Sequence, residues 1–184
     1  MRYQTILLVK AVGRNALRFN TSGSQNTALG EQSLASNTTA NNNTGVGQYS
    51  LQQNTTGTQN VAVGTFCLDA NTTGDSNTAM GYAALSSSTT AHNNTAVGRD
   101  ALRDTTTATQ NAAFGTAALY ANVTGNNNTA LGFQCLANNT NSNNTAVGFD
   151  ALKLNTAGTF NTAVGSSALD ANTTASNNNS FGYG

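Results

Sequence analysis

The chain contains no proline and no tryptophan, and only 8% of its 184 residues carry a charged side chain. Seven basic and seven acidic residues give a formal net charge of zero. This balance offers no electrostatic basis for binding nucleic acid or an anionic membrane. Uncharged polar residues, namely asparagine, threonine, serine and glutamine, take the place of charged ones. They keep the surface hydrated but do not attract a charged partner.

Long hydrophobic runs are also missing. The one apolar run, Ile6 to Val9, is too short to cross a bilayer, and no cleavage site follows it. We therefore expect neither a transmembrane helix nor a signal peptide. This fits a virion protein assembled inside a cell, or a mature or fragmentary chain without its export signal, and the sequence leaves both open.

Against these absences stands a glycine that returns every seventeen residues, with one step of sixteen before Gly148. The column comprises Gly13, Gly30, Gly47, Gly64, Gly81, Gly98, Gly115, Gly132, Gly148, Gly165 and Gly182. A leucine follows four residues later in almost every unit, at Leu17, Leu34, Leu51, Leu68, Leu85, Leu102, Leu119, Leu136, Leu152 and Leu169. A fixed short period predicts one unit stacked on itself rather than a disordered polar chain, with a local irregularity at the sixteen-residue step.

The unit reads N-T-A-[VLMF]-G-x-x-[ASC]-L-x-x-N-T-T-[GA]-x-x. Seventeen residues are too few for a helical repeat, and these compositions disfavour helices. The sequence predicts an all-β parallel β-solenoid of about eleven coils. We expect two short strands per coil, around N-T-A-V and A-L, with corners at the repeat glycine and at N-T-T-G. The second corner, at Gly23, Gly57, Gly74, Gly125 and Gly158, suits a left-handed residue.

The columns of the repeat predict an interior. We expect the leucines and the residues just before the repeat glycine to point inward, with the neighbouring alanines on the opposite face. A strand that is apolar at two adjacent columns is expected to be buried on both faces. Association of several copies, most simply a homotrimer, would cover the outer face. The alternative is that an exposed alanine column needs no partner.

Two asparagine columns predict hydrogen-bonded ladders between coils. The first is unbroken: Asn26, Asn43, Asn60, Asn77, Asn94, Asn111, Asn128, Asn144, Asn161 and Asn178. The second is interrupted by Ser88 and Thr105: Asn20, Asn37, Asn54, Asn71, Asn122, Asn139, Asn155 and Asn172.

The residues that usually carry chemistry do not form a site. Cys67 and Cys135 share the small-residue column four coils apart, roughly 19 Å at the interstrand spacing, so a disulfide is excluded and packing is predicted. His92 falls in a variable turn column. The pairs Arg99-Asp100 and Arg103-Asp104 predict a surface ion cluster. We expect no catalytic, cofactor-binding or metal-binding residue and no enzyme, and the acidic residues lack the spacing of calcium repeats.

Two further interpretations concern the polar columns. Regular threonines on a flat face suggest an ice-binding solenoid as a minor alternative, although adjacent N-T-T threonines face opposite ways. Asn-x-Ser/Thr acceptors recur in every part of the chain. If it is exported through a glycosylating pathway, possible glycosylation sites include Asn37, Asn54, Asn71, Asn122 and Asn172.

The motif N-T-A-V-G at Asn94–Gly98 and Asn161–Gly165 resembles the head repeats of YadA-like trimeric autotransporter adhesins. The longer unit from Asn60 through Gly74 is similar to repeats of phage tail-fibre proteins. The resemblance runs from Val12 to Gly182 and implies a left-handed parallel β-roll, assembled as a trimer and serving attachment to a surface. Receptor contacts in these families are not fixed by the repeat, so no binding residue is implied.

We therefore expect an N-terminal strand over residues 1–11, which caps the solenoid or docks on the next molecule, and a repeat domain over 12–184. The expected function is a non-enzymatic fibre protein, the shaft or head of an extracellular, cell-surface or virion adhesin. Its partners would be copies of itself and a cell-surface or glycan receptor. The alternative is a subunit of a head-to-tail filament, in a glycosylated or an unglycosylated form.

Overall fold

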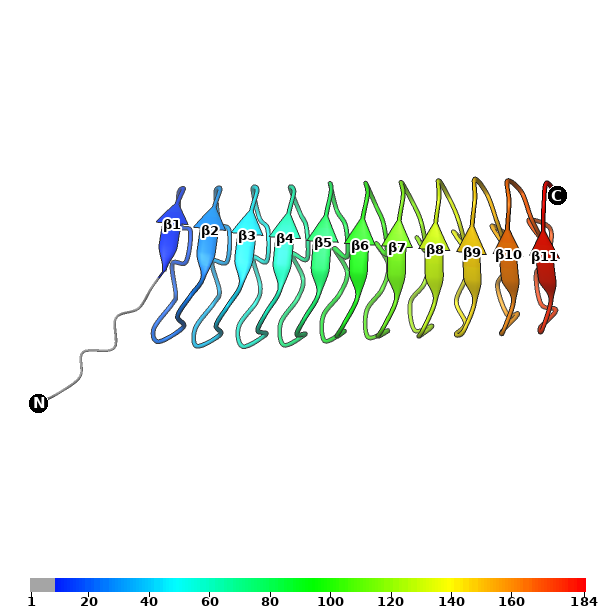
Figure 1. Cartoon of the computed structure of the whole chain (residues 1–184). Coiled ribbons are helices and arrows are strands. Elements are labelled where there is room, and N and C mark those ends of the chain that lie inside the picture. The colour runs from blue at the N-terminus through cyan, green and yellow to red at the C-terminus, as the bar shows by residue number, and fades with distance from the viewer. Residues whose placement is uncertain (1–8) are drawn as a thin grey trace, which may run out of the picture.

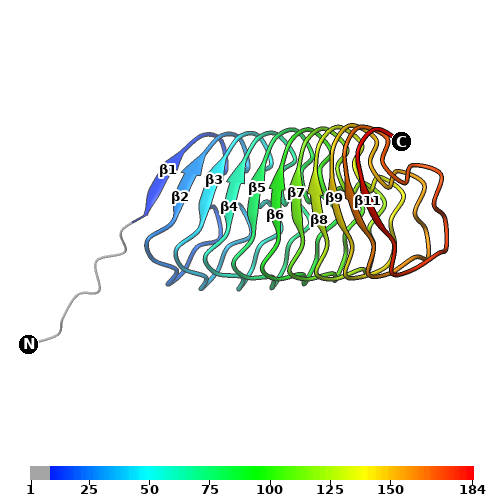
Figure 2. The same ribbon diagram turned by 45° about the vertical axis from the view of Figure 1, so that its right-hand side comes forward.

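The fold is a single parallel sheet rolled into a β-solenoid. The structure is a computed structural model, and it describes residues 9–184. Each of its eleven strands has three residues and pairs with the strand of the next coil, in chain order. Figures 1 and 2 show these strands side by side along a rod, with the first and last coils at opposite ends. The strands are β1 (Lys10–Val12), β2 (Thr27–Leu29), β3 (Thr44–Val46), β4 (Val61–Val63), β5 (Thr78–Met80), β6 (Thr95–Val97), β7 (Ala112–Phe114), β8 (Thr129–Leu131), β9 (Thr145–Val147), β10 (Thr162–Val164) and β11 (Asn179–Phe181).

The predicted β-solenoid is confirmed, and its first strand begins at Lys10. β1 pairs with β2 in the register of every later coil, so Lys10 and Ala11 already belong to the stack. The proposed capping or docking role of the preceding segment falls mainly on residues 1–8, outside the described residues.

Only one strand forms in each coil, and the expected second strand around A-L is wrong. The leucines of this segment have φ angles near +50°, which is the left-handed region rather than extended backbone. The residue two places before each leucine is also left-handed, so the segment is a tight turn. The turn is held from coil to coil, since the amide of Leu34 donates to the Ser50 carbonyl at 3.0 Å. These hydrogen bonds offset the strain of about 1–2 kcal/mol that a left-handed non-glycine residue carries.

The repeat glycine forms a corner that no other residue can form. At Gly98 the φ angle is +137°, and a Cβ atom would lie 2.5 Å from the carbonyl oxygen of Gly115 in the next coil. Backbone stacks on backbone at this corner, so the column requires glycine for both conformation and space. The predicted corner is confirmed.

The second corner differs from the prediction. Gly23, Gly57 and the other glycines of the N-T-T-G position do not adopt positive φ. The left-handed residue comes two places later, at Gln25 and Gln59 among others. The glycine position points into the coil and is fully covered, as is Ala91 at the equivalent place. Its requirement is a small side chain and not a left-handed backbone.

The interior contains the predicted leucines, but the strand turns inward the face opposite to the one that was predicted. Leu34 through Leu152 are 0% exposed, whereas Leu29, Met80 and Leu131, directly before the repeat glycine, are 43–49% exposed. The central strand residue points inward instead, as Ala62 and Ala96 do. The expected interior column is therefore outside, and the expected outer alanines are inside. A coil this thin has room for alanine, leucine and asparagine, but not for a second large apolar column.

The sixteen-residue step is absorbed at one corner. Thr129 of β8 pairs with Thr145 of β9, so the sheet register continues without a shift. The missing residue falls between Thr140 and Asn141, in the N-T-T-G corner, where the bends occupy different positions from those in the other coils. The expected local irregularity is confirmed.

Candidate functional site

The side chains that most often carry chemistry are dispersed in this structure. Among residues 9–184, no group of three or more His, Cys, Asp or Glu side chains could hold a metal ion. Cys67 and Cys135 are buried and unpaired, as predicted for packing residues. Burial raises the pKa of each thiol to about 12, so neither forms a thiolate near neutral pH. No helix in the described part of the chain could span a membrane.

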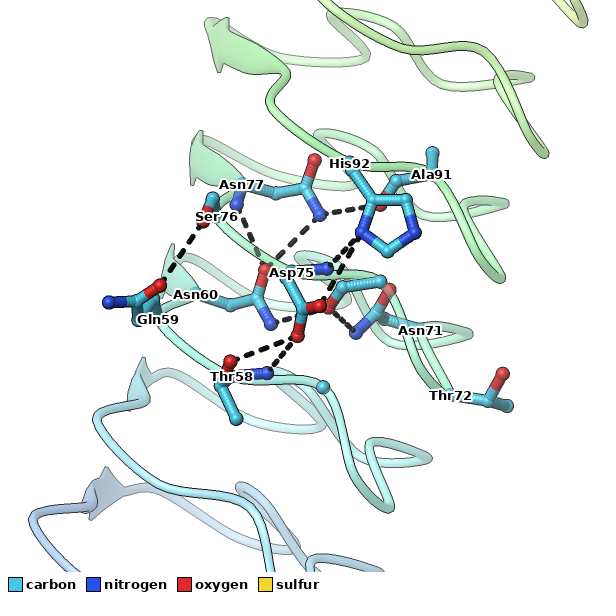
Figure 3. A network of polar contacts seen from close by, with 12 residues as sticks. Thr58, Gln59, Asn60, Asn71, Thr72, Asp75, Ser76, Asn77, Ala91 and His92 are labelled. Carbon is cyan, nitrogen blue, oxygen red and sulfur yellow. Dashed lines mark hydrogen bonds and ion pairs between the residues drawn. The ribbon is translucent and has the colours of Figure 1, made fainter.

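The predicted turn position of His92 is confirmed, and the turn gives it a specific contact. Figure 3 shows the imidazole beside Asp75 of the preceding coil. The backbone amide of Asp75 donates to Nδ1 of His92 at 2.9 Å. In the same way, the Asp75 carboxylate accepts a hydrogen bond from the backbone amide of Thr58, one coil earlier, at 2.6 Å. His92 therefore belongs to a column of side chains that accept a hydrogen bond from the backbone amide of the preceding coil.

The unbroken asparagine column, which we call the strand ladder, lies just before the strands (Figure 3). Oδ1 of Asn60 accepts the backbone amide of Asn77 at 2.9 Å, and Nδ2 of Asn60 donates to the Gly74 carbonyl at 2.7 Å. The same acceptor contact joins every successive pair from Asn26 to Asn178. The strand ladder therefore supplies an acceptor for a buried backbone amide and a donor for a corner carbonyl in each coil.

The interrupted column, which we call the corner ladder, runs through the N-T-T-G corners from Asn20 to Asn172. Nδ2 of Asn71 donates to Oδ1 of Asn54 at 2.8 Å and to the carbonyl of Gly74 at 3.0 Å. Its links between coils thus join side chain to side chain. Both ladders converge on the same carbonyl, since Gly74 also accepts from the strand ladder.

The predicted glycosylation positions lie in the corner ladder. Asn37, Asn54, Asn71 and Asn122 are 0% exposed, and Asn172 is half-buried. Each uses its Nδ2 to donate to a carbonyl three residues later. A glycan on this nitrogen replaces one amide hydrogen and needs space outside the coil. Modification at the first four positions remains a prediction, and it requires transfer before the coil closes.

The threonines of the corner are also used structurally. The hydroxyl of Thr55 donates to the Thr72 carbonyl at 3.0 Å, and that of Thr72 donates to the Thr89 carbonyl at 3.0 Å. This column is therefore a third set of links between coils, and its hydroxyls are not a free row facing water. In most pairs the second threonine, such as Thr56 or Thr73, is the exposed one. This weakens the basis for ice binding at the corner.

The outer strand face is the most continuous surface feature. It consists of the two strand residues that flank the inward alanine, so it carries one polar and one apolar column. The polar column is mainly threonine: Thr27, Thr44, Thr78, Thr95, Thr129, Thr145 and Thr162. The apolar column is Val12, Leu29, Val46, Val63, Met80, Val97, Phe114, Leu131, Val147, Val164 and Phe181. Large apolar side chains in such a row are typical of a surface that meets another protein.

The two predicted arginine-aspartate pairs lie together in the coil that follows Gly98, as expected for an ion cluster. Arg99 Nε lies 3.0 Å from Asp100 Oδ2, and Arg103 Nε lies 3.8 Å from Asp104 Oδ1. Sequence reasoning missed that this cluster borders a hollow, which also contains Phe66 and Tyr82. The sequence contained a partial signal, because aromatic and charged side chains follow one another in the successive repeats that hold Phe66, Tyr82 and Arg99. Its meaning depends on which columns share a face.

Comparison of the chain with protein-family models, curated proteins and solved structures finds no match.

Proposed function

We propose that this chain is a non-enzymatic structural protein, the shaft or head of an extracellular or virion fibre that attaches to a surface. In this proposal three copies associate side by side, and each is a left-handed β-roll. The repeat resemblance to adhesin heads and tail fibres supports attachment. The coil-to-coil links support a mechanical role, because one parallel sheet and the strand ladder continue from coil to coil over residues 10–181.

The observation that carries the proposal is the outer strand face. The sequence predicts a partner that covers a column of alanines, whereas the exposed column contains Val, Leu, Met and Phe. Burial of apolar area stabilises association by about 25 cal/mol per Å², so these larger side chains favour a partner more strongly than alanines would. A straight apolar column on a rod is best covered by the same column of another copy.

The oligomeric state tests this proposal directly. The mass measured by light scattering should be three times the 18.8 kDa of one chain. The double variant Phe114→Lys, Leu131→Lys places charge on the outer strand face and should yield monomers. The control Thr107→Lys, Thr124→Lys changes exposed corner residues of the same two coils and should leave the trimer intact. A monomeric wild type would contradict the trimer.

A second candidate, the head-to-tail filament, is favoured by the ends of the sheet. Strands β1 and β11 each have one paired edge and one unpaired edge among residues 9–184. Unpaired strand edges are templates for a further strand, and the two ends have matching registers. Electron micrographs of wild type and of a variant without residues 1–10 would separate the candidates. Filaments that persist unchanged in the variant would exclude docking through that segment.

A further inference from the structure

A hollow with a volume of about 380 Å³ opens on the surface between the coils of Gly64 and Gly98. It exists because Ala83 and Ser86 are small. The equivalent positions hold Phe66 and Asp69 in the coil before, and Asp100 and Arg103 in the coil after. The small pair leaves a gap with larger side chains on both sides. This volume lies within the range of about 300–1,000 Å³ that is usual for small-ligand sites.

One wall of the hollow is aromatic and held in place. The ring of Phe66 stacks on Tyr49, with centroids 5.2 Å apart and planes within 7°. On its other side, Tyr82 meets Phe66 edge-on at 6.1 Å. Tyr82 keeps 52% of its surface exposed. The hollow therefore offers a rigid apolar ring surface whose geometry is set by neighbouring coils.

The remaining walls carry both acceptors and donors. Oδ1 of Asp69 is buried and, among residues 9–184, has no hydrogen-bond partner. Burial raises the pKa of Asp69 to about 6, so the carboxyl can accept or donate near neutral pH. Arg103 is fixed by its hydrogen bond to the Tyr120 hydroxyl and by packing of its guanidinium 5.1 Å from that ring's centroid. Arg99 is held by Asp100 at 3.0 Å.

We propose that this hollow binds a neutral saccharide, with a pyranose ring packed against Tyr82 and Phe66 and its hydroxyls hydrogen-bonded to Asp69 and Arg103. A sugar presents an apolar C–H face and a rim of hydroxyls that donate and accept, which matches an aromatic wall beside a carboxyl and a guanidinium. Two arginines beside Asp69, Asp100 and Asp104 leave no strong excess of either charge. This arrangement favours a neutral polyhydroxyl ligand over a phosphate or a basic peptide.

The inference deepens the proposed function and rests on it, because it names the class of surface group that the fibre would hold. It does not depend on the oligomeric state. The hollow lies on columns after the repeat glycine, whereas the outer strand face lies on columns before it.

The test is saturation-transfer NMR on the whole chain with the methyl glycosides of glucose, galactose, mannose and N-acetylglucosamine. At least one should receive magnetisation from the protein and bind saturably. Ser86→Tyr should fill the hollow and raise the dissociation constant at least about tenfold. Tyrosine already stands in this column as Tyr120, so the fold should accept it. The matched control Ala137→Tyr lies in the same column outside the hollow and should bind as wild type does.

Thermal unfolding of both tyrosine variants verifies that they are folded. If no glycoside binds the wild type, or if Ser86→Tyr binds as tightly as wild type, the saccharide site is overturned. Light scattering on the same samples reports the assembly separately. A trimer without sugar binding removes the site alone, and a monomer that binds sugar removes the trimer alone.

Discussion

The two asparagine ladders run side by side through the same coils, yet only one tolerates other residues. The strand ladder has asparagine at every step, whereas the corner ladder accepts Ser88 and Thr105. Both bury a neutral amide and both donate to the same carbonyls. The ladders differ in the donor whose hydrogen bond the asparagine Oδ1 accepts. In the strand ladder it accepts a backbone amide, and in the corner ladder it accepts a neighbouring side chain.

This difference shows which buried hydrogen bonds a repeat can lose. A backbone N–H inside the coil cannot be substituted away, so its acceptor must be supplied in every coil. A side-chain donor can be replaced together with its acceptor. The corner ladder has unpaired atoms only at its breaks, which are Asn71 Oδ1 and Ser88 Oγ at one break and Asn122 Oδ1 at the short coil. Each break leaves one or two side-chain atoms without a hydrogen bond, but none leaves a backbone amide of the ladder without its acceptor.

The largest expected effect comes from breaking the two ladders with the same substitution. In Asn94→Ser, the Asn111 amide loses its acceptor at 3.0 Å and the Ala108 carbonyl loses its donor at 2.8 Å. We expect the free energy of unfolding to fall by roughly 3 kcal/mol, since each unsatisfied buried group costs about 1–3 kcal/mol. Asn54→Ser in the corner ladder should cost about 1 kcal/mol. Urea unfolding of both variants measures this, and equal losses would refute the distinction.

Repair of a break in the corner ladder should raise the free energy of unfolding instead of lowering it. In Ser88→Asn, the new Nδ2 can donate to Asn71 Oδ1 and to the Ala91 carbonyl, as its counterparts do in other coils. One unpaired oxygen then remains where two unpaired atoms stood. We expect a gain of about 1 kcal/mol in the same urea experiment. Ser87→Asn, one residue earlier and outside the ladder, serves as the control and should leave stability unchanged.

A smaller gain is expected from restoring the seventeen-residue spacing. Asn139 now donates to the carbonyl of Asn141, only two residues away, and leaves Asn122 Oδ1 without a partner. Insertion of one threonine after Thr140 should let Asn139 donate to Asn122. Amide hydrogen exchange near residues 139–144 should then slow towards the rate of neighbouring corners. Unchanged or faster exchange would show that the short corner is already as well satisfied.

The smallest effect concerns pH, which should not act on either ladder because amides do not titrate. Asp69 lies outside them, and burial raises its pKa from an ordinary value of 3.8 to about 6. A raised folded-state pKa means that the native state holds the proton more tightly, so its contribution is full below about pH 4 and is lost as pH rises through 6. Asp69→Asn should therefore be more stable than wild type above pH 6. The difference should vanish near pH 4, and a constant difference would assign it to packing.

Much of the fold follows from the spacing of a few residue types. The repeat glycine, the leucine column and the asparagine ladders could be predicted, because each needs one residue type at one place in a stacked coil. The inward face of the strand could not, since Ala62 and Val63 are both apolar and only the width of the coil excludes the larger one. The turn at Leu68 was also hidden, because leucine has no preference for left-handed backbone.

The candidate site was less accessible to sequence reasoning than the fold. The ion pairs of Arg99 and Arg103 could be predicted. The hollow beside them could not, because it exists only where the small side chains of Ala83 and Ser86 leave space. A gap of this kind is visible only when the columns on its face are known. The acceptor role of His92 was hidden for a similar reason, since its column varies in residue type while keeping one hydrogen-bonding task.

The identical register at every step has a consequence for how such a rod changes over generations. Each coil meets the next through the same sheet register and the same strand-ladder contact, so a repeat can be duplicated or deleted without creating a new kind of interface. One repeat alters the reach of the rod by about 4.8 Å, the spacing between strands. The outer strand face lengthens in the same proportion. In the proposed assembly, the reach of the rod and the area that associates would therefore change together, as multiples of a single unit.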